Sequence, residues 1–140
     1  YEEDRVPFEM DRATVISGGT DLAIIACGEM VRPAMQAAEL LKERGISAAV
    51  LDMYCLKPLD EKAVITAAEG VKAVITVEEH APFGGLGAMV SQVLAKNCPR
   101  KMDILALPDA PVITGTSKEV FDYYGLNAEG IAKKAMELLT

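Results

Sequence analysis

Residues 73–91 read AVITVEEHAPFGGLGAMVS and join a β-branched apolar run to a glycine cluster and then to a segment with helical apolar spacing. This order predicts a buried strand over 72–77 and a helix over 86–96, connected by one turn. The turn holds His80, the only histidine of the chain, next to two adjacent glutamates. In open α/β sheets, ligands meet the turns that leave the carboxyl ends of strands, so we expect any site to include or border this turn.

Strand and helix patterns alternate along the rest of the chain. Strands are expected at 13–17, 22–26, 48–53 and 102–107. Helices are expected at 31–44 and, after an N-cap at Asp60, at about 61–69. Capping-box spacing between Thr116 and Glu119 predicts a helix that ends at Tyr124, and a last helix is expected to follow an N-cap at Asn127. Alternating elements of this length form right-handed βαβ units. The predicted fold class is therefore α/β, a three-layer α/β/α sandwich with a mostly parallel sheet.

One edge of this sheet is expected to be antiparallel. Only a short segment that begins with Gly18 and Gly19 separates the strand at 13–17 from the strand at 22–26. Such a connection is too short for a parallel crossover. If the two strands are neighbours, they pair antiparallel.

Composition limits the classes of partner and the location. The chain has 140 residues, which fits one domain with a single core, and its 14 basic and 21 acidic residues give a net charge of −7. No basic stripe is present to replace the counterions of phosphates, so no nucleic-acid partner is expected. No apolar run is long enough to cross a bilayer and the first residues are too charged for a signal peptide, so we expect no membrane association and a cytoplasmic protein.

The ends and the cysteines add two expectations. Residues 1–12 are polar and are expected to be a linker from an upstream domain into a single domain at 13–140. The chain begins with Tyr1 rather than methionine, so we expect it to be a piece of a longer protein. The cysteines, Cys27, Cys55 and Cys98, lack paired spacing and are expected to be free thiols.

His80 could act as an acid or base, with Glu78 or Glu79 orienting it. No nucleophile follows it directly, since Ser91 falls in the next helix and Cys55 follows another strand. A histidine that fixes a turn or an interface is therefore favoured over a small hydrolase. If the strand continues through the two glutamates, they cannot both face the same way, because side chains alternate along a strand. We expect one of them to bind backbone N–H groups or a basic residue of another domain.

The glycines at positions 84, 85 and 87 precede a helix, and a helix N-terminus favours anions. Their spacing matches neither GxGxxG nor GxxxxGK[ST]. They are therefore expected to serve a turn with positive φ and close packing of the helix on the sheet. A freestanding nucleotide- or anion-binding module is the alternative. With one histidine, no cysteine pair and no oxygen-rich loop, no metal site is expected.

Four segments taken in order give a more specific indication: TDLAIIACGEMV, AVLDMYCLKPLDEKAV, VITVEEHAPFGGLGAMVSQVL and GTSKEVFDYYGLNAEGIAKKAMELL. Together they resemble the C-terminal domain of transketolase-like thiamine diphosphate enzymes, over residues 13–140. The KPLD sequence at 57–60 and the VEEH sequence followed by GGLG are the most specific pieces.

This resemblance implies a five-stranded, mostly parallel sheet with one antiparallel strand. It implies that the complete enzyme transfers two-carbon ketol units between sugar phosphates on thiamine diphosphate and magnesium. In the family an N-terminal domain holds this cofactor and its metal, and a middle domain supplies the activating glutamate. We therefore expect no catalytic, cofactor-binding or metal-binding residue in this chain, and no activity of the chain alone.

The expected partners are the N-terminal and middle domains, in the same or a separate chain, within a homodimer or heterotetramer. The candidate interface residues are Tyr54, Glu79, His80, Gly84, Gly85 and Gly87. Tyr54 departs from 1-deoxy-xylulose-5-phosphate synthase, which has arginine at this position for substrate phosphate. A phenol lacks the fixed charge and forked donors of arginine. Tyr54 thus argues against a deoxyxylulose phosphate synthase. The overall pattern is closer to the C-terminal subunit of a split transketolase, and a deoxyxylulose phosphate synthase or the β chain of a 2-oxoacid dehydrogenase is the alternative.

Overall fold

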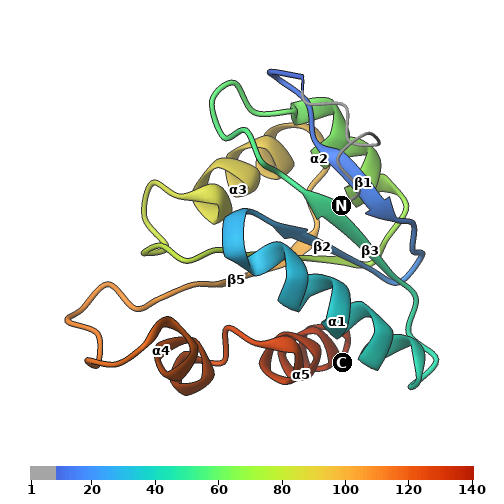
Figure 1. The fold of residues 1–140 in the computed structure, drawn as a ribbon. Coiled ribbons are helices and arrows are strands. Elements are labelled where there is room, and N and C mark those ends of the chain that lie inside the picture. The colour runs from blue at the N-terminus through green and yellow to red at the C-terminus, as the bar shows by residue number, and fades with distance from the viewer. Residues whose placement is uncertain (1–8) are drawn as a thin grey trace.

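The structure is a computed structural model that describes residues 9–140 (Figure 1). The expected linker at 1–12 lies mostly outside these residues. The five strands are β1 (Thr14–Ser17), β2 (Leu22–Ala26), β3 (Ala48–Asp52), β4 (Ala73–Val77) and β5 (Lys101–Leu105). The helices are the short 3-10 helix η1 (Gly28–Met30) followed by α1 (Val31–Lys42), α2 (Glu61–Glu69), α3 (Leu86–Asn97), α4 (Ser117–Tyr124) and α5 (Ala128–Leu139). None of the described helices is long and apolar enough to span a membrane.

The sheet lies between two helical layers, which confirms the three-layer α/β/α prediction. Its strand order is β1-β3-β2-β4-β5, and Figure 1 shows α1 and α5 on one face and α2 and α3 on the other. A hydrophobic core lies on each face of the sheet, and successive residues of β2 belong to different cores. Ile24 packs toward α1 and α5, and Ile25 packs toward α2 and α3. This follows from the period of two along a strand, and it explains why the central strands are apolar throughout.

The sheet has one antiparallel pair, β1 with β3, at its edge. All other neighbouring strands run parallel. The expected antiparallel edge strand is therefore present, but β1 and β2 are not neighbours and do not pair, because the connecting residues cross the amino end of β3. There the N–H groups of Thr20 and Asp21 donate to Ser47 O at 3.2 and 2.9 Å. A Cβ on Gly19 would lie 2.1 Å from Ala49 N, so only glycine allows this close crossing.

Local capping signals set several helix ends. The Asp60 carboxylate accepts from Ala63 N at 2.9 Å and begins α2 as predicted. Thr116 and Glu119 form a capping box at α4, and Gly125 ends that helix in the left-handed conformation. Helix α1 ends at Lys42, two residues before the predicted 44, and β5 ends at Leu105 rather than at 107.

Candidate functional site

Several of the predicted residues meet at the carboxyl edge of the sheet. A pocket of about 300 Å³ opens there between the ends of β2 and β4. It is lined by Cys27, Gly28, Glu29, Leu56, Glu78, Glu79, His80, Gly84 and Gly85. Of the candidate interface residues, Tyr54 and Gly87 do not line this pocket.

Glu78 is the best-defined side chain of this edge. It is 1% exposed, and its two carboxylate oxygens accept hydrogen bonds from Leu86 N at 2.7 Å and Gly87 N at 2.8 Å. These are two of the unpaired amides in the first turn of α3, where a negative charge also interacts favourably with the helix dipole. The sequence predicted that one of the two glutamates binds backbone N–H groups, and the structure identifies Glu78. Because this carboxylate occupies both amides, they are not free to hold a phosphate.

The glycines of the turn have two geometric roles. Gly84 has a φ of +77°, which favours glycine. A Cβ on Gly85 would lie 2.0 Å from Glu78 Oε2, and a Cβ on Gly87 would lie 2.6 Å from the Ile104 side chain. The predicted positive-φ turn and close packing of helix on sheet are therefore both present.

His80 is exposed, and its Nδ1 lies 2.7 Å from Ala81 O. In the neutral ring this carbonyl places the proton on Nδ1 and leaves Nε2 as the acceptor. The backbone oxygen of His80 accepts from Leu107 N at 3.0 Å, which joins the turn after β4 to the loop after β5. The hydroxyl of Ser91 donates to Ala88 O within α3, so it is not presented to His80 as a nucleophile.

Cys27 is a residue that the search for a nucleophile missed. It lies at the end of β2 and shares the pocket with His80, because β2 and β4 are adjacent in the sheet. Burial raises the pKa of its thiol to about 11, and the nearby Glu78 and Asp52 carboxylates add to this effect. A thiol with a raised pKa is a poor nucleophile at neutral pH. The pocket therefore lacks the activated nucleophile that a cysteine hydrolase needs.

The remaining candidates face outward or join the start of the domain. Glu79 is exposed and makes no hydrogen bond or ion pair within the described part of the chain. The Tyr54 hydroxyl donates to Glu9 O at 2.9 Å and is 3.3 Å from Glu9 N. Tyr54 thus ties the entering chain to the end of β3.

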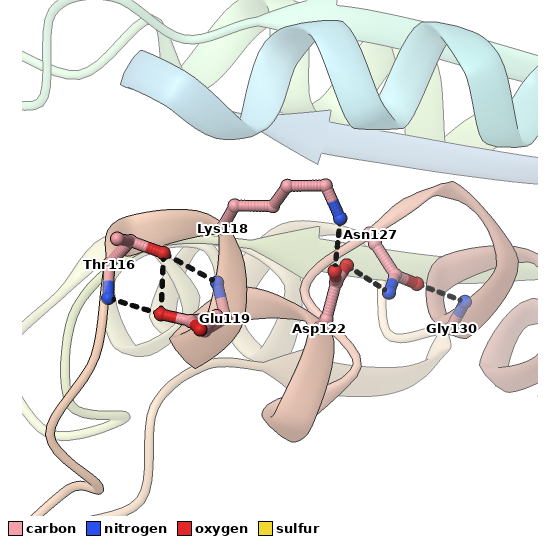
Figure 2. A network of polar contacts seen from close by, with 6 residues as sticks. All are labelled: Thr116, Lys118, Glu119, Asp122, Asn127 and Gly130. Atoms are coloured by element: carbon pink, nitrogen blue, oxygen red, sulfur yellow. Dashed lines mark hydrogen bonds and ion pairs between the residues drawn. The ribbon is translucent and has the colours of Figure 1, made fainter.

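The loop after β5 is held by the helices that follow it. Ile113 N donates to the Tyr124 hydroxyl at 3.2 Å. Figure 2 shows the polar network of the two helices that follow this loop, which includes the Thr116–Glu119 capping box and the Lys118–Asp122 ion pair. The Asn127 side chain donates to Asp122 at 2.9 Å and accepts from Gly130 N at 2.8 Å. This network fixes α4 against the start of α5 and so fixes the end of the loop.

A metal or diphosphate site does not arise from these side chains. Within residues 9–140 no group of three or more His, Cys, Asp and Glu residues could hold a metal ion. The α3 amides, which could have met a phosphate, already bind Glu78. The described residues therefore do not fit thiamine diphosphate with its magnesium.

Comparisons with known proteins relate this chain to one family of domains. The family described as "Transketolase, C-terminal domain" matches residues 11–131. One of the subunits of an apulose-4-phosphate transketolase from Phocaeicola vulgatus is 48% identical over 139 residues, which are 99% of this chain and 44% of that protein. A 1-deoxy-D-xylulose-5-phosphate synthase from a Synechococcus strain is 39% identical over 134 residues, which are 95% of this chain and 21% of that protein.

Among solved structures, a split-gene transketolase described as an inactive beta4 tetramer aligns with a TM-score of 0.90 and 35% identity. The alignment covers 99% of this chain and 45% of that one. The chain thus spans less than half the length of these relatives.

Proposed function

The chain belongs to the family of transketolase C-terminal domains, and from this we propose that it is the C-terminal part of a split transketolase-like enzyme. The complete enzyme, meaning this chain with the N-terminal and middle domains of the family, would transfer two-carbon ketol units between sugar phosphates. The observation that carries the proposal is the match of nearly the whole chain to a split-gene transketolase at a TM-score of 0.90. The name of the Phocaeicola vulgatus relative supports a phosphorylated sugar as the substrate class.

In this proposal the chain is not catalytic alone. Thiamine diphosphate with magnesium supplies the electron sink for ketol transfer when it is bound to the complete enzyme. The side chains described above form no site for it, so we assign its binding to the other domains. Glu78 and the glycines around it shape the edge of this domain, and the chain acts by supporting the assembly.

Two alternatives are less well supported. A deoxyxylulose phosphate synthase would need a phosphate-binding group at position 54, but Tyr54 has no fixed charge and its hydroxyl is bound to Glu9. A freestanding anion-binding module would need free amides at the start of α3, and these are bound to Glu78.

We further propose a cytoplasmic enzyme that assembles as a homodimer or a heterotetramer. The names of two relatives, both described as subunits, support assembly from more than one part, whether in one chain or in two. The acidic balance of the chain, with a net charge of −7, argues against a nucleic-acid partner.

Titration calorimetry and reconstitution test the proposal. The isolated chain is titrated with thiamine diphosphate and magnesium, and we expect no tight binding. Mixing or joining the chain with the N-terminal and middle domains should restore both cofactor binding and ketol transfer between sugar phosphates. Tight cofactor binding by the isolated chain, or a reconstituted enzyme that forms deoxyxylulose phosphate instead, would overturn it.

A further inference from the structure

Apolar side chains are exposed on two loops at the carboxyl edge of the sheet. Phe83 is 74% exposed, Val112 is 45% exposed and Ile113 is 36% exposed. They belong to segments 79–85 and 107–115, which leave the same end of the sheet in Figure 1. We call these two segments, together with Glu29, which lines the same pocket as Glu79, the carboxyl-edge surface. Exposed apolar side chains on loops at one end of a sheet are a common feature of surfaces that contact another protein part.

The two loops are held in place by polar contacts. Leu107 N donates to His80 O at 3.0 Å, and Glu78 N donates to Leu105 O at 3.1 Å, so the loops are joined at their base. The far end of the second loop is bound where Ile113 N meets Tyr124. Because the backbone is fixed in this way, a partner would meet side chains already in position and lose less conformational entropy on binding.

The chain enters the domain at the same carboxyl end of the sheet, beside β3, whereas the two loops follow β4 and β5. Strand β1 runs antiparallel to β3, so Thr14 at its start lies opposite Asp52 at the carboxyl end of β3. The residues just before it are also held there, since Glu9 binds Tyr54 and Ala13 N donates to Asp60 Oδ2 at 3.0 Å. The matched family is a C-terminal domain and the chain spans less than half of the Phocaeicola vulgatus relative, so polypeptide that precedes the domain in such relatives would start from the carboxyl end of the sheet.

Charge favours a partner other than a second copy. The exposed carboxylates of Glu29, Glu79 and Asp109 accompany the apolar residues, and none of them forms an ion pair within the described residues. Two copies of this surface facing each other would bring like charges together, which disfavours the pairing. A basic surface with apolar residues complements it instead.

We propose that the carboxyl-edge surface binds the domain that precedes this one in the longer relatives, through Phe83, Val112 and Ile113 in contact with apolar residues and through Glu29 and Glu79 in contact with basic residues. This inference rests on the proposed function, because it takes the complete enzyme to contain that domain. Beyond the proposed function, the inference names the surface through which this chain binds the preceding domain. It also states that the contacting surface of that domain is basic and apolar.

Site-specific photo-crosslinking in the complete enzyme tests this inference. A photoreactive phenylalanine analogue is placed at Phe83, at Val112 or, as a control, at Met35, which is 43% exposed on α1. We expect positions 83 and 112 to cross-link to residues of the preceding domain, and position 35 not to do so. Cross-links between two copies of position 83, or none from 83 and 112 in an assembled enzyme, would overturn the inference.

Charge reversal gives a second readout. Glu79→Lys should lower the thermal midpoint of the complete enzyme more than Glu43→Lys, which reverses an exposed charge just after α1. Equal effects of the two substitutions would count against the role of Glu79. Ketol transfer by the unmodified enzyme is measured in parallel. If transfer occurs but cross-links are absent, the surface is wrong and the proposed function stands. If neither thiamine diphosphate binding nor transfer occurs, the proposed function itself fails.

Discussion

Replacement of Glu78 should destabilise the domain strongly, because its carboxylate is buried and binds two amides of α3. A hydrogen bond to a charged group contributes about 1.5–3 kcal/mol. Glu78→Ala removes two such bonds and is expected to cost about 3–6 kcal/mol. That loss is comparable to the whole stability of a small domain, about 5–15 kcal/mol.

Glu78→Gln is the more informative substitution because it preserves the volume of the side chain. It keeps one acceptor oxygen, but its NH₂ group then faces a second donor, either Leu86 N or Gly87 N. We expect a loss of about 1.5–3 kcal/mol in the free energy of unfolding. With a denaturant slope of about 1–3 kcal/mol/M, the urea midpoint should fall by roughly 1 M.

Urea unfolding followed by far-UV circular dichroism at pH 7 measures this loss. Glu79→Gln is the matched control, since Glu79 is adjacent but exposed. Its effect should stay within about 0.5 kcal/mol. If the two glutamine variants unfold at the same urea concentration, the carboxylate of Glu78 does not hold the turn and the reasoning is refuted.

Three further predictions follow from individual contacts. Gly85→Ala should lower the thermal midpoint because its Cβ would displace a buried carboxylate, whereas Gly70→Ala, with open space around its Cβ, should leave it unchanged or raise it; equal shifts would refute this. Thr76→Val should stabilise the chain by about 1 kcal/mol in urea unfolding, since within the described residues the Thr76 hydroxyl is buried without a partner; a loss of stability would mean that the hydroxyl is satisfied. The Lys118 and Asn127 side chains lower the pKa of Asp122, so the stability from this contact is present at neutral pH and is lost as the pH falls through the lowered value. Lys118→Met should raise that pKa in an NMR titration, and an unchanged titration would contradict the ion pair.

Most of the fold was predictable because its signals are local or periodic. Apolar runs, helical spacing and capping signals located the five strands and the helices α1 to α5 to within a few residues, whereas the short helix η1 was not predicted. The caps at Asp60, Thr116 and Asn127 bind amides three residues onward in the chain, so neighbouring sequence contains both partners. The expected alternation of side chains favoured different orientations for the two glutamates, and Glu78 is buried while Glu79 is exposed, although β4 ends at Val77.

The candidate site was predictable only in part. The sequence located the VEEH turn at the carboxyl edge and attributed its glycines to a turn and close packing. It did not show which glutamate is buried, and it did not show that Cys27 shares the pocket of His80. The first depends on the path of the turn between β4 and α3, and the second depends on β2 and β4 being neighbours in the sheet. Neither follows from a local sequence pattern.

The elements and their alternation were predictable because they follow from periodicity and from contacts between near neighbours, and four segments of the sequence carried the family resemblance. The folded arrangement was needed to establish that β1 pairs with β3, that Glu78 rather than Glu79 binds the first amides of α3, and that Phe83 and Val112 are exposed at the carboxyl end of the sheet. The pairing of β1 depends on packing between segments distant in the chain, whereas the burial of Glu78 and the exposure of the loop residues depend on the paths of the turns, which no periodic pattern specifies. Pairing across the sheet selects one arrangement among several that the same local signals would allow.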